Sequence, residues 1–147
     1  MSVGCALLDV NVLIALLDPW HVHHEPAHRW FAAHHHQGWA SCPLTENAVL
    51  RILGHPRYPN SPGSPAVVAG VLHAWLGHPD HHFWPDSLSL LASDHVDPHQ
   101  LLDAGAITDT YLLALAAQQG GTLVSLDRRL GIRAVAGGEA ALRLIPT

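Results

Sequence analysis

Short apolar runs alternate along the chain with longer stretches whose apolar residues recur every three or four positions. The short runs are typical of buried strands, and the longer spacing is typical of helices packed on one face. The pattern predicts strands at residues 4–8, 39–42, 82–84, 122–126 and 142–145. It predicts helices at residues 12–17, 26–36, 43–53, 65–76, 98–104 and 109–119, and leaves residues 87–92 as a strand or a short helix.

Proline and hydroxyl residues mark where several of these helices begin. Pro43 and Pro65 suit the first turn of a helix, where a backbone N–H has no helical partner. Ser64 and Thr108 are the predicted N-caps of their helices. Residues 54–65 contain four prolines and two glycines, so they are predicted to form a loop and to be the least ordered part of the chain.

Strands separated by helices predict an α/β fold, with a small, mostly parallel sheet covered by helices on both faces. A length of 147 residues fits a single domain spanning residues 1–147. The aromatic side chains are expected to pack in the core or in a dimer interface rather than to stack on bases. These side chains are Trp30, Phe31, Trp39, Trp75 and Trp84.

The basic residues exclude several classes of enzyme. The chain has 14 histidines and no lysine, so its seven basic residues are all arginines. Without lysine it cannot be a P-loop NTPase, a protein kinase or a Schiff-base enzyme. A net charge of −5 gives no basic tail for nucleic acid. An anionic substrate must therefore be held by a metal, by a few arginines or by a partner.

The apolar runs and the cysteines indicate the compartment. The longest uninterrupted apolar stretch, residues 111–117, is far shorter than the roughly 20 residues of a membrane span. Asp9 interrupts the first apolar run, which is unlike a signal peptide. Cys5 and Cys42 form no CxxC motif and are expected to be buried, reduced thiols. The sequence therefore predicts a cytoplasmic protein with no membrane partner.

Four carboxylates stand at positions that the predicted fold brings to one edge of the sheet. Asp9 and Asp127 each follow a strand, and Glu46 and Asp109 each lie in the first turn of a helix. In an open parallel sheet these positions share the edge where ligands bind. Carboxylates gathered there suit Mg²⁺ or Mn²⁺. The fitting chemistry is hydrolysis of a phosphodiester by water that the cation activates.

Each of these acids also has a purely local interpretation. Asp9 and Asp127 are each placed to cap the turn that follows, and Glu46 and Asp109 to complement a helix dipole. The local interpretation is weakest for Asp9, because burying an unpaired charge after an apolar strand is costly. The other acids are predicted to lie in loops or on the surface: Asp18, Glu25, Asp80, Asp86, Asp94, Asp97, Asp103 and Glu139.

Four motifs in order resemble those of the PIN-domain ribonucleases. Residues 7–13 (LLDVNVL) resemble the family's first strand, residues 45–53 its second motif, residues 107–112 its third and residues 123–129 (LVSLDRR) its fourth. The sequence HPRY and the helix opened by Ser64 resemble the VapC branch, the toxins of bacterial toxin–antitoxin pairs. The likeness covers nearly the whole chain.

The resemblance implies a three-layer α/β/α sandwich and an RNA-cleaving toxin that slows translation. It implies that Asp9, Glu46, Asp109 and Asp127 hold Mg²⁺ or Mn²⁺. It further implies polar support from Asn11, Thr45, Thr108 and Ser125. The implied partners are RNA, a second copy of the chain in a homodimer and a cognate VapB-like antitoxin whose tail blocks the site. Residues 125–127 read Ser-Leu-Asp where the family more often has Thr-Phe-Asp, which keeps the hydroxyl.

The expected mechanism is metal-dependent hydrolysis that leaves a 5′-phosphate and a 3′-hydroxyl and needs no 2′-hydroxyl. Asp9 and Asp109 are expected to ligate the metal most directly, and Glu46 and Asp127 to act through water or to orient the nucleophile. Three arginines are candidates for phosphate contacts, with surface solubility or antitoxin contact as the alternative. These are Arg51, Arg128 and Arg129.

Two further function classes stay open, one based on the histidines and one without catalysis. His24 and His28 are four residues apart, which suits a zinc site. Alternatively, two histidines could act as acid and base in a metal-independent ribonuclease that leaves a cyclic phosphate. A PIN-like interaction module without catalytic activity is the non-enzyme alternative. Survival of RNA cleavage in a chelator distinguishes the histidine-based enzyme, and absence of any cleavage distinguishes the interaction module.

Overall fold

A computed structural model describes residues 4–147 and contains one five-stranded sheet. The strands are β1 (Ala6–Leu8), β2 (Trp39–Ser41), β3 (His81–Phe83), β4 (Thr122–Ser125) and β5 (Leu142–Leu144). Their order is β3-β2-β1-β4-β5, and all four neighbouring pairs are parallel. The predicted parallel sheet is confirmed, and its central strand is β1.

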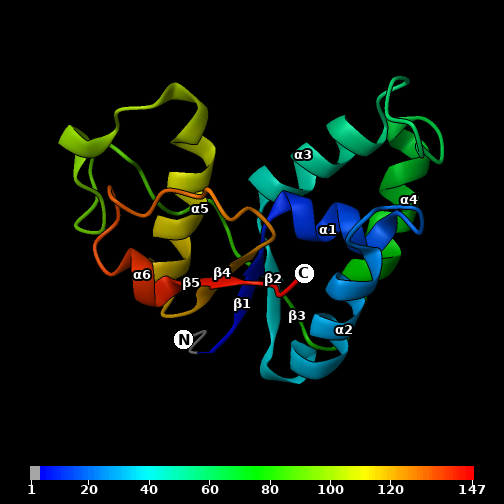
Figure 1. Ribbon diagram of the computed structural model, residues 1–147, viewed down its shortest axis with the longest axis horizontal. Coiled ribbons are helices and arrows are strands. Elements are labelled where there is room, and N and C mark those ends of the chain that lie inside the picture. The colour runs from blue at the N-terminus through cyan, green and yellow to red at the C-terminus, as the bar shows by residue number, and fades with distance from the viewer. Residues whose placement is uncertain (1–3) are drawn as a thin grey trace.

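Helices cover both faces of the sheet, as predicted (Figure 1). On one side lie α1 (Val10–Leu17), α2 (His24–His34), α3 (Pro43–Leu53) and α4 (Pro65–Leu76). On the other side lie α5 (Ile107–Gln118) and α6 (Gly138–Ala141). Three short 3₁₀ turns complete the description: η1 (His35–Gln37), η2 (Pro98–Gln100) and η3 (Ala104–Ala106). The fold is thus the expected three-layer α/β/α sandwich.

Each face of the sheet has its own core, because successive side chains of a strand point to opposite faces. Leu8 of β1 packs with the α1–α4 side, and Leu7 packs with α5. The aromatic residues follow the prediction of core packing. Phe31, Trp39 and Trp84 are buried. Trp30 and Trp75 are half-buried against the first core. Both cysteines are free and buried.

Three local predictions are wrong. Residues 87–92 form neither strand nor helix, because serine hydroxyls accept nearby N–H groups there, as Ser89 does from Leu91 at 3.1 Å. Residues 98–104 are not one helix; η2 and η3 are separate turns. Thr108 is not an N-cap, because α5 already begins at Ile107. The sequence analysis did not predict α6, because four residues are too few to show a helical period.

Proline placement at the starts of α3 and α4 is confirmed. Ser64 does occupy the N-cap position of α4, but its side chain makes no capping hydrogen bond.

Within residues 4–147, no helix is long and apolar enough to cross a membrane.

Asp18 is a correction to the sequence analysis, because it is buried rather than exposed, with 2% of its surface accessible. Its Oδ2 accepts hydrogen bonds from the Tyr58 hydroxyl at 2.5 Å and from the Asn60 side chain at 3.0 Å. Burial raises its pKa, but these bonds and one from the Trp20 N–H outweigh burial, so the pKa is lowered overall. The proline-rich loop is therefore anchored to the end of α1.

Candidate active site

Three of the four predicted acids meet at the carboxyl edge of the two central strands. Asp9 directly follows β1 and is the N-cap of α1, and its N–H donates to the Val124 carbonyl of β4 at 2.9 Å. Asp127 follows β4, and Asp109 lies in the first turn of α5. Parallel pairing of β1 with β4 brings these positions together although they are far apart in sequence.

Asp9 is almost fully buried, with 4% of its surface exposed, and is held by three donors. The Ser125 hydroxyl donates to its Oδ2 at 2.7 Å, and the Val10 N–H donates to its Oδ1 at 2.7 Å. The Asn11 amide lies 3.4 Å from Oδ2. The carboxylate is thus fixed in orientation, which a group that binds a ligand requires.

Asn11 and Ser125 connect the start of α1 to the end of β4. The Asn11 amide nitrogen donates to the Ser125 hydroxyl at 3.2 Å, and its oxygen accepts from the Leu126 N–H at 3.1 Å. The Ser125 hydroxyl also accepts from the Asp127 N–H at 3.0 Å. Two of the four predicted supporting residues therefore contact the acids or the backbone that carries them.

The negative charge of Asp127 acts on both Asp9 and Asp109, which shows that the three acids lie close together. Burial, followed by the negative charges of Asp9 and Asp127, raises the pKa of Asp109 to about 6. Burial also raises the pKa of Asp9; the bonds from Ser125 and Val10 oppose this, and the charge of Asp127 adds to it. We call Asp9, Asp109 and Asp127 the aspartate trio. A cation placed among them relieves this repulsion.

Glu46, the fourth predicted acid, has its carboxylate turned toward β2. The Ser41 hydroxyl donates to its Oε2 at 2.6 Å. Ser41 has one hydroxyl proton, so the 2.8 Å contact with His81 Nε2 requires the histidine to donate to Ser41. The sequence analysis missed Ser41 and His81 as partners of Glu46. The sequence gives a weak indication for Ser41, because it is the last residue of a strand. His81 can be predicted as a partner only if the pairing register of β3 is known.

The other two predicted supports act differently from Asn11 and Ser125. Thr45 is buried, and its hydroxyl exchanges hydrogen bonds with the backbone of Cys42, accepting from the N–H and donating to the carbonyl, both at 3.0 Å. It therefore fixes the start of α3, the helix that carries Glu46. Thr108 is exposed on the wall of the hollow described next.

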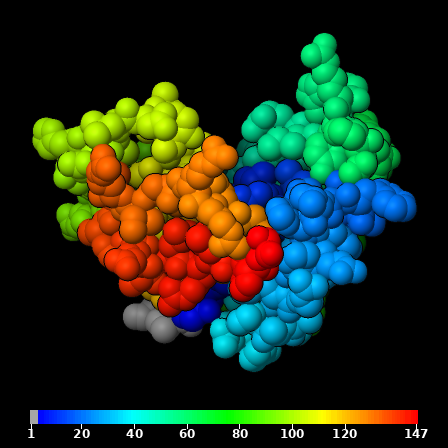
Figure 2. Space-filling view, viewed as in Figure 1, coloured from blue at the N-terminus to red at the C-terminus, as the bar shows by residue number. Residues whose placement is uncertain are grey.

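A hollow of about 360 Å³ opens beside Asp9 and Asp109, two members of the aspartate trio. In the space-filling view, a notch separates the helices near α3 from the opposite lobe, with α1 at its floor (Figure 2). The lining combines acids, one arginine and apolar walls: Asp9, Val10, Asn11, Ile14, Ala48, Arg51, Ile52, Thr108 and Asp109. Asp9 and Asp109 thus both line one hollow, although little of Asp9 is exposed there.

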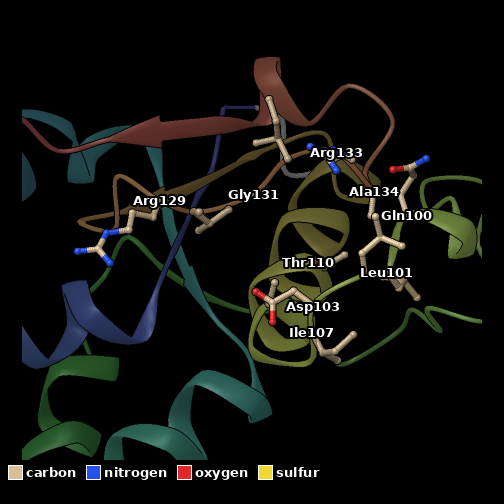
Figure 3. Close-up of a pocket in the computed structure, with 13 residues that line it drawn as sticks. Gln100, Leu101, Asp103, Ile107, Thr110, Arg129, Gly131, Arg133 and Ala134 are labelled. Carbon is tan, nitrogen blue, oxygen red and sulfur yellow. The ribbon is translucent and has the colours of Figure 1, made fainter.

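The three candidate arginines have different surroundings. Arg51 lines the hollow. The Arg128 guanidinium is engaged by the chain end, donating to the Ile145 carbonyl at 2.8 Å and to the Thr147 hydroxyl at 3.1 Å. Arg129 borders a second hollow of about 440 Å³ beside the start of α5, where its side chain extends away from the other labelled residues (Figure 3).

His24 and His28 have a structural role. The His24 Nδ1 lies 2.7 Å from the Ala15 carbonyl, and the His28 Nε2 lies 2.9 Å from the Leu16 carbonyl. A carbonyl only accepts, so each ring donates to one of the last carbonyls of α1. The i,i+4 spacing that suggested zinc thus serves to cap a helix.

Comparison with known proteins agrees with this geometry. The PIN domain model matches residues 6–137. The chain is 43% identical over 132 residues to Ribonuclease VapC44 of Mycobacterium tuberculosis, covering 90% of this chain and 92% of that protein. It is 42% identical over 132 residues to Ribonuclease VapC39 of the same organism, covering 90% and 95%. It is 38% identical over 141 residues to Ribonuclease VapC29, also of that organism, covering 96% and 96%. The chain therefore belongs to the PIN-domain family, among the VapC ribonucleases.

Proposed function

We propose that this protein is a Mg²⁺- or Mn²⁺-dependent endoribonuclease and the toxin of a toxin–antitoxin pair. The observation that carries the proposal is that Asp9 and Asp109 line one open hollow, where burial and the negative charges of Asp9 and Asp127 raise the pKa of Asp109 to about 6. Carboxylates that repel one another at a solvent-filled edge are suited to a divalent cation. The names of the relatives, all ribonucleases, indicate RNA as the substrate.

The donor set fits a hard cation. Carboxylate oxygens are the ligands that Mg²⁺ and Mn²⁺ prefer, and the hollow leaves room for water and a substrate phosphate. Asp9 and Asp109 would hold the cation directly, and Asp127 and Glu46 through water. The cation, when bound, supplies charge neutralisation at the phosphate and lowers the pKa of water.

The chain's own residues do the remaining work. Ser125 and Asn11 orient Asp9 by donating to its Oδ2, and the Ser125 bond opposes the rise in the Asp9 pKa that burial causes. Asp109 has to lose its proton for the site to be complete. Glu46 reaches the hollow only by leaving the Ser41 hydroxyl, and from there it would orient the attacking water. Hydrolysis by this route leaves a 5′-phosphate and a 3′-hydroxyl and makes no use of the 2′-hydroxyl.

Positive charge for the RNA backbone would come chiefly from Arg51. It lines the hollow that the acids face, and a guanidinium binds phosphate through two hydrogen bonds. Arg129 would contact RNA further from the acids. Arg128 is the weakest of the three candidates, because its guanidinium is engaged by residues 145–147.

We further propose a single-domain protein that acts in the cytoplasm as a homodimer and slows translation by cutting RNA. Its cognate antitoxin would be a VapB-like protein whose tail enters the acidic hollow. The support is family membership together with a hollow that holds both acids and an arginine.

Cleavage of total RNA by the purified protein, free of antitoxin, tests this function. We expect cleavage with Mg²⁺ or Mn²⁺, none with EDTA, and none with Asp9→Asn or Asp109→Asn. Asp94→Asn is the matched control, because Asp94 is exposed. Cleavage that persists in EDTA would contradict the proposal and favour the histidine-based enzyme. No cleavage with either metal would favour the interaction module.

A further inference from the structure

We propose a second metal site, specific for a transition-metal cation of the Zn²⁺ class, at the opposite edge of the sheet from the aspartate trio. It consists of His35, His78 and Asp80, which we call the His–Asp trio. One ligand atom from each residue lies within 4.8 Å of the other two. His35 lies in η1 just before β2, and the other two residues lie in the turn just before β3. These are the amino ends of strands whose carboxyl ends face the acids.

The His–Asp trio is held together before any ion binds. The His35 Nδ1 lies 2.7 Å from the Asp80 Oδ2. The His78 Nδ1 accepts from the Asp80 N–H at 3.1 Å and from the Trp39 indole N–H at 3.4 Å. The Trp39 N–H in turn donates to the Asp80 carbonyl at 3.1 Å. The ligands are thus carried by two turns that the sheet itself joins.

Packing restricts the two rings further. The Phe31 ring lies 5.4 Å from the His35 ring and 5.4 Å from the His78 ring. The two imidazoles lie 5.0 Å apart at an interplanar angle of 74°. About a third of each of the His35 and Asp80 side chains is exposed, so an ion reaches them from solvent. Restricted ligands reduce the conformational entropy that binding costs.

The ligand chemistry selects the class of cation. Two imidazoles and one carboxylate suit Zn²⁺ and its neighbours, whereas Mg²⁺ prefers oxygen ligands throughout. The His78 Nδ1 is an acceptor whose single lone pair faces the Asp80 and Trp39 N–H groups, so an ion bound at this nitrogen would replace these contacts. Ligand atoms about 2.0–2.2 Å from one ion lie closer together than 4.8 Å. Small side-chain rotations close the site, and the ion takes the place of the proton shared by His35 and Asp80.

Asp80 distinguishes this site from the adventitious metal binding that a histidine-rich surface shows. The chain has 14 histidines, and exposed imidazoles bind Zn²⁺ weakly wherever two are close. In the His–Asp trio a carboxylate provides the third ligand and offsets part of the ionic charge. The neighbouring His34 donates instead to the Trp30 carbonyl, 2.9 Å away in its own helix. An ion bound by the trio joins the turn before β2 to the turn before β3, so it should stabilise that edge of the sheet.

Competition with a chromophoric Zn²⁺ chelator, using the full chain and excess Mg²⁺ to occupy the acids, tests the site. We expect one equivalent of Zn²⁺ to bind well above the weak background. Asp80→Asn, which keeps the side-chain shape, and His35→Gln should each weaken this equivalent at least about tenfold. Asp94→Asn and the double variant His24→Gln/His28→Gln should keep it. Zn²⁺ should also raise the Tm of the wild-type chain but not that of Asp80→Asn.

Equal Zn²⁺ affinity and stoichiometry in wild type and Asp80→Asn would overturn the proposal, as would loss of the tight equivalent only in the His24/His28 variant. Folding of each variant is checked by circular dichroism without metal. Histidine ring NMR of the unmutated chain gives a second readout: stoichiometric Zn²⁺ should shift the resonances of His35 and His78 before those of other rings. Asp109→Asn should retain the Zn²⁺ site, so this result is independent of the proposed nuclease activity.

Discussion

The Ser125 hydroxyl, at the end of β4, donates a 2.7 Å hydrogen bond to Oδ2 of Asp9, the residue that follows β1. Both side chains are buried, and their strands are parallel neighbours. This bond lowers the pKa of Asp9 against burial and the charge of Asp127, which raise it. It is therefore the contact that most opposes the rise in pKa that burial imposes on Asp9, the most buried acid of the site.

Ser125→Ala should weaken the site without removing an acid. The variant loses a donor to Asp9 and an acceptor for the Asp127 N–H, so the pKa of Asp9 rises further. We expect the Mg²⁺ concentration for half-maximal cleavage to rise about 10- to 100-fold, as is usual when a support of a metal ligand is removed. Ser125→Thr keeps the hydroxyl and is the control. Equal Mg²⁺ dependence of the alanine variant and wild type would show that the bond is unimportant.

Asp109 should make the stability of the metal-free protein fall as pH rises. In the folded chain its pKa is about 6, against 3.8 for a free aspartate side chain, so between these values the folded state binds more protons than the unfolded state. The free energy of unfolding therefore decreases with pH across this window. Asp109→Asn removes the effect and should be more stable than wild type at pH 7 by about 1 kcal/mol, allowing for partial exposure.

Urea unfolding of both proteins in EDTA at pH 4, 5, 6 and 7 measures this difference. Comparing the two proteins cancels the titration of the histidines. The gap should grow with pH and then shrink when Mg²⁺ is added, since only wild type has the complete site. A gap that stays constant from pH 4 to 7 would contradict the electrostatic account of Asp109.

Parallel α/β topology explains why the sequence predicted that three of the acids lie close together. Asp9, Asp109 and Asp127 each stand at a strand end or a helix start, and such positions share one edge of the sheet. No contact had to be known to place them together. The same reasoning predicted that Glu46 lies near this edge, but it did not predict that its carboxylate binds Ser41.

The features that the sequence did not predict depend on side-chain direction and on long-range contacts. The sequence around Asp18 is typical of a surface residue. Its donors, Tyr58 and Asn60, are about 40 residues away and are brought to it only by the folded loop. Arg128 looks like an RNA contact beside Asp127, but the chain end occupies its guanidinium. The His–Asp trio joins residues 45 positions apart through the register of β2 and β3, which no local spacing reveals.

Arg51 and Arg128 should differ in their effect on RNA binding. Arg51→Ala removes the arginine that lines the acidic hollow, and we expect KM for RNA to rise about 5- to 10-fold with a smaller change in kcat. Arg128→Ala should leave KM within about twofold, because its guanidinium is engaged by the Ile145 carbonyl. Steady-state cleavage of a short fluorescent RNA measures both. A larger KM effect from Arg128→Ala would reverse the assignment.

Tyr58→Phe should destabilise the protein while leaving the chemistry intact. The variant removes the hydroxyl that donates to buried Asp18 and leaves part of that carboxylate without a donor. We expect the free energy of unfolding to fall by about 1–3 kcal/mol. Because the pKa of Asp18 is lowered in the folded state, this contribution is present above the unfolded pKa and is lost as pH falls through the folded value. Urea unfolding at pH 7 and pH 3 should therefore show a larger difference at pH 7.

The chemical nature of the RNA ends tests the central claim most directly. RNA cut by the wild-type protein in Mg²⁺ is analysed for its termini, and the mapped site is then rebuilt with a 2′-deoxynucleotide on the 5′ side of the cut. Hydrolysis at the aspartate trio predicts 5′-phosphate and 3′-hydroxyl ends, and continued cleavage of the deoxy-substituted RNA. Cyclic phosphate ends, together with loss of cleavage in the deoxy-substituted RNA, would contradict the account and assign the reaction to histidine acid–base chemistry.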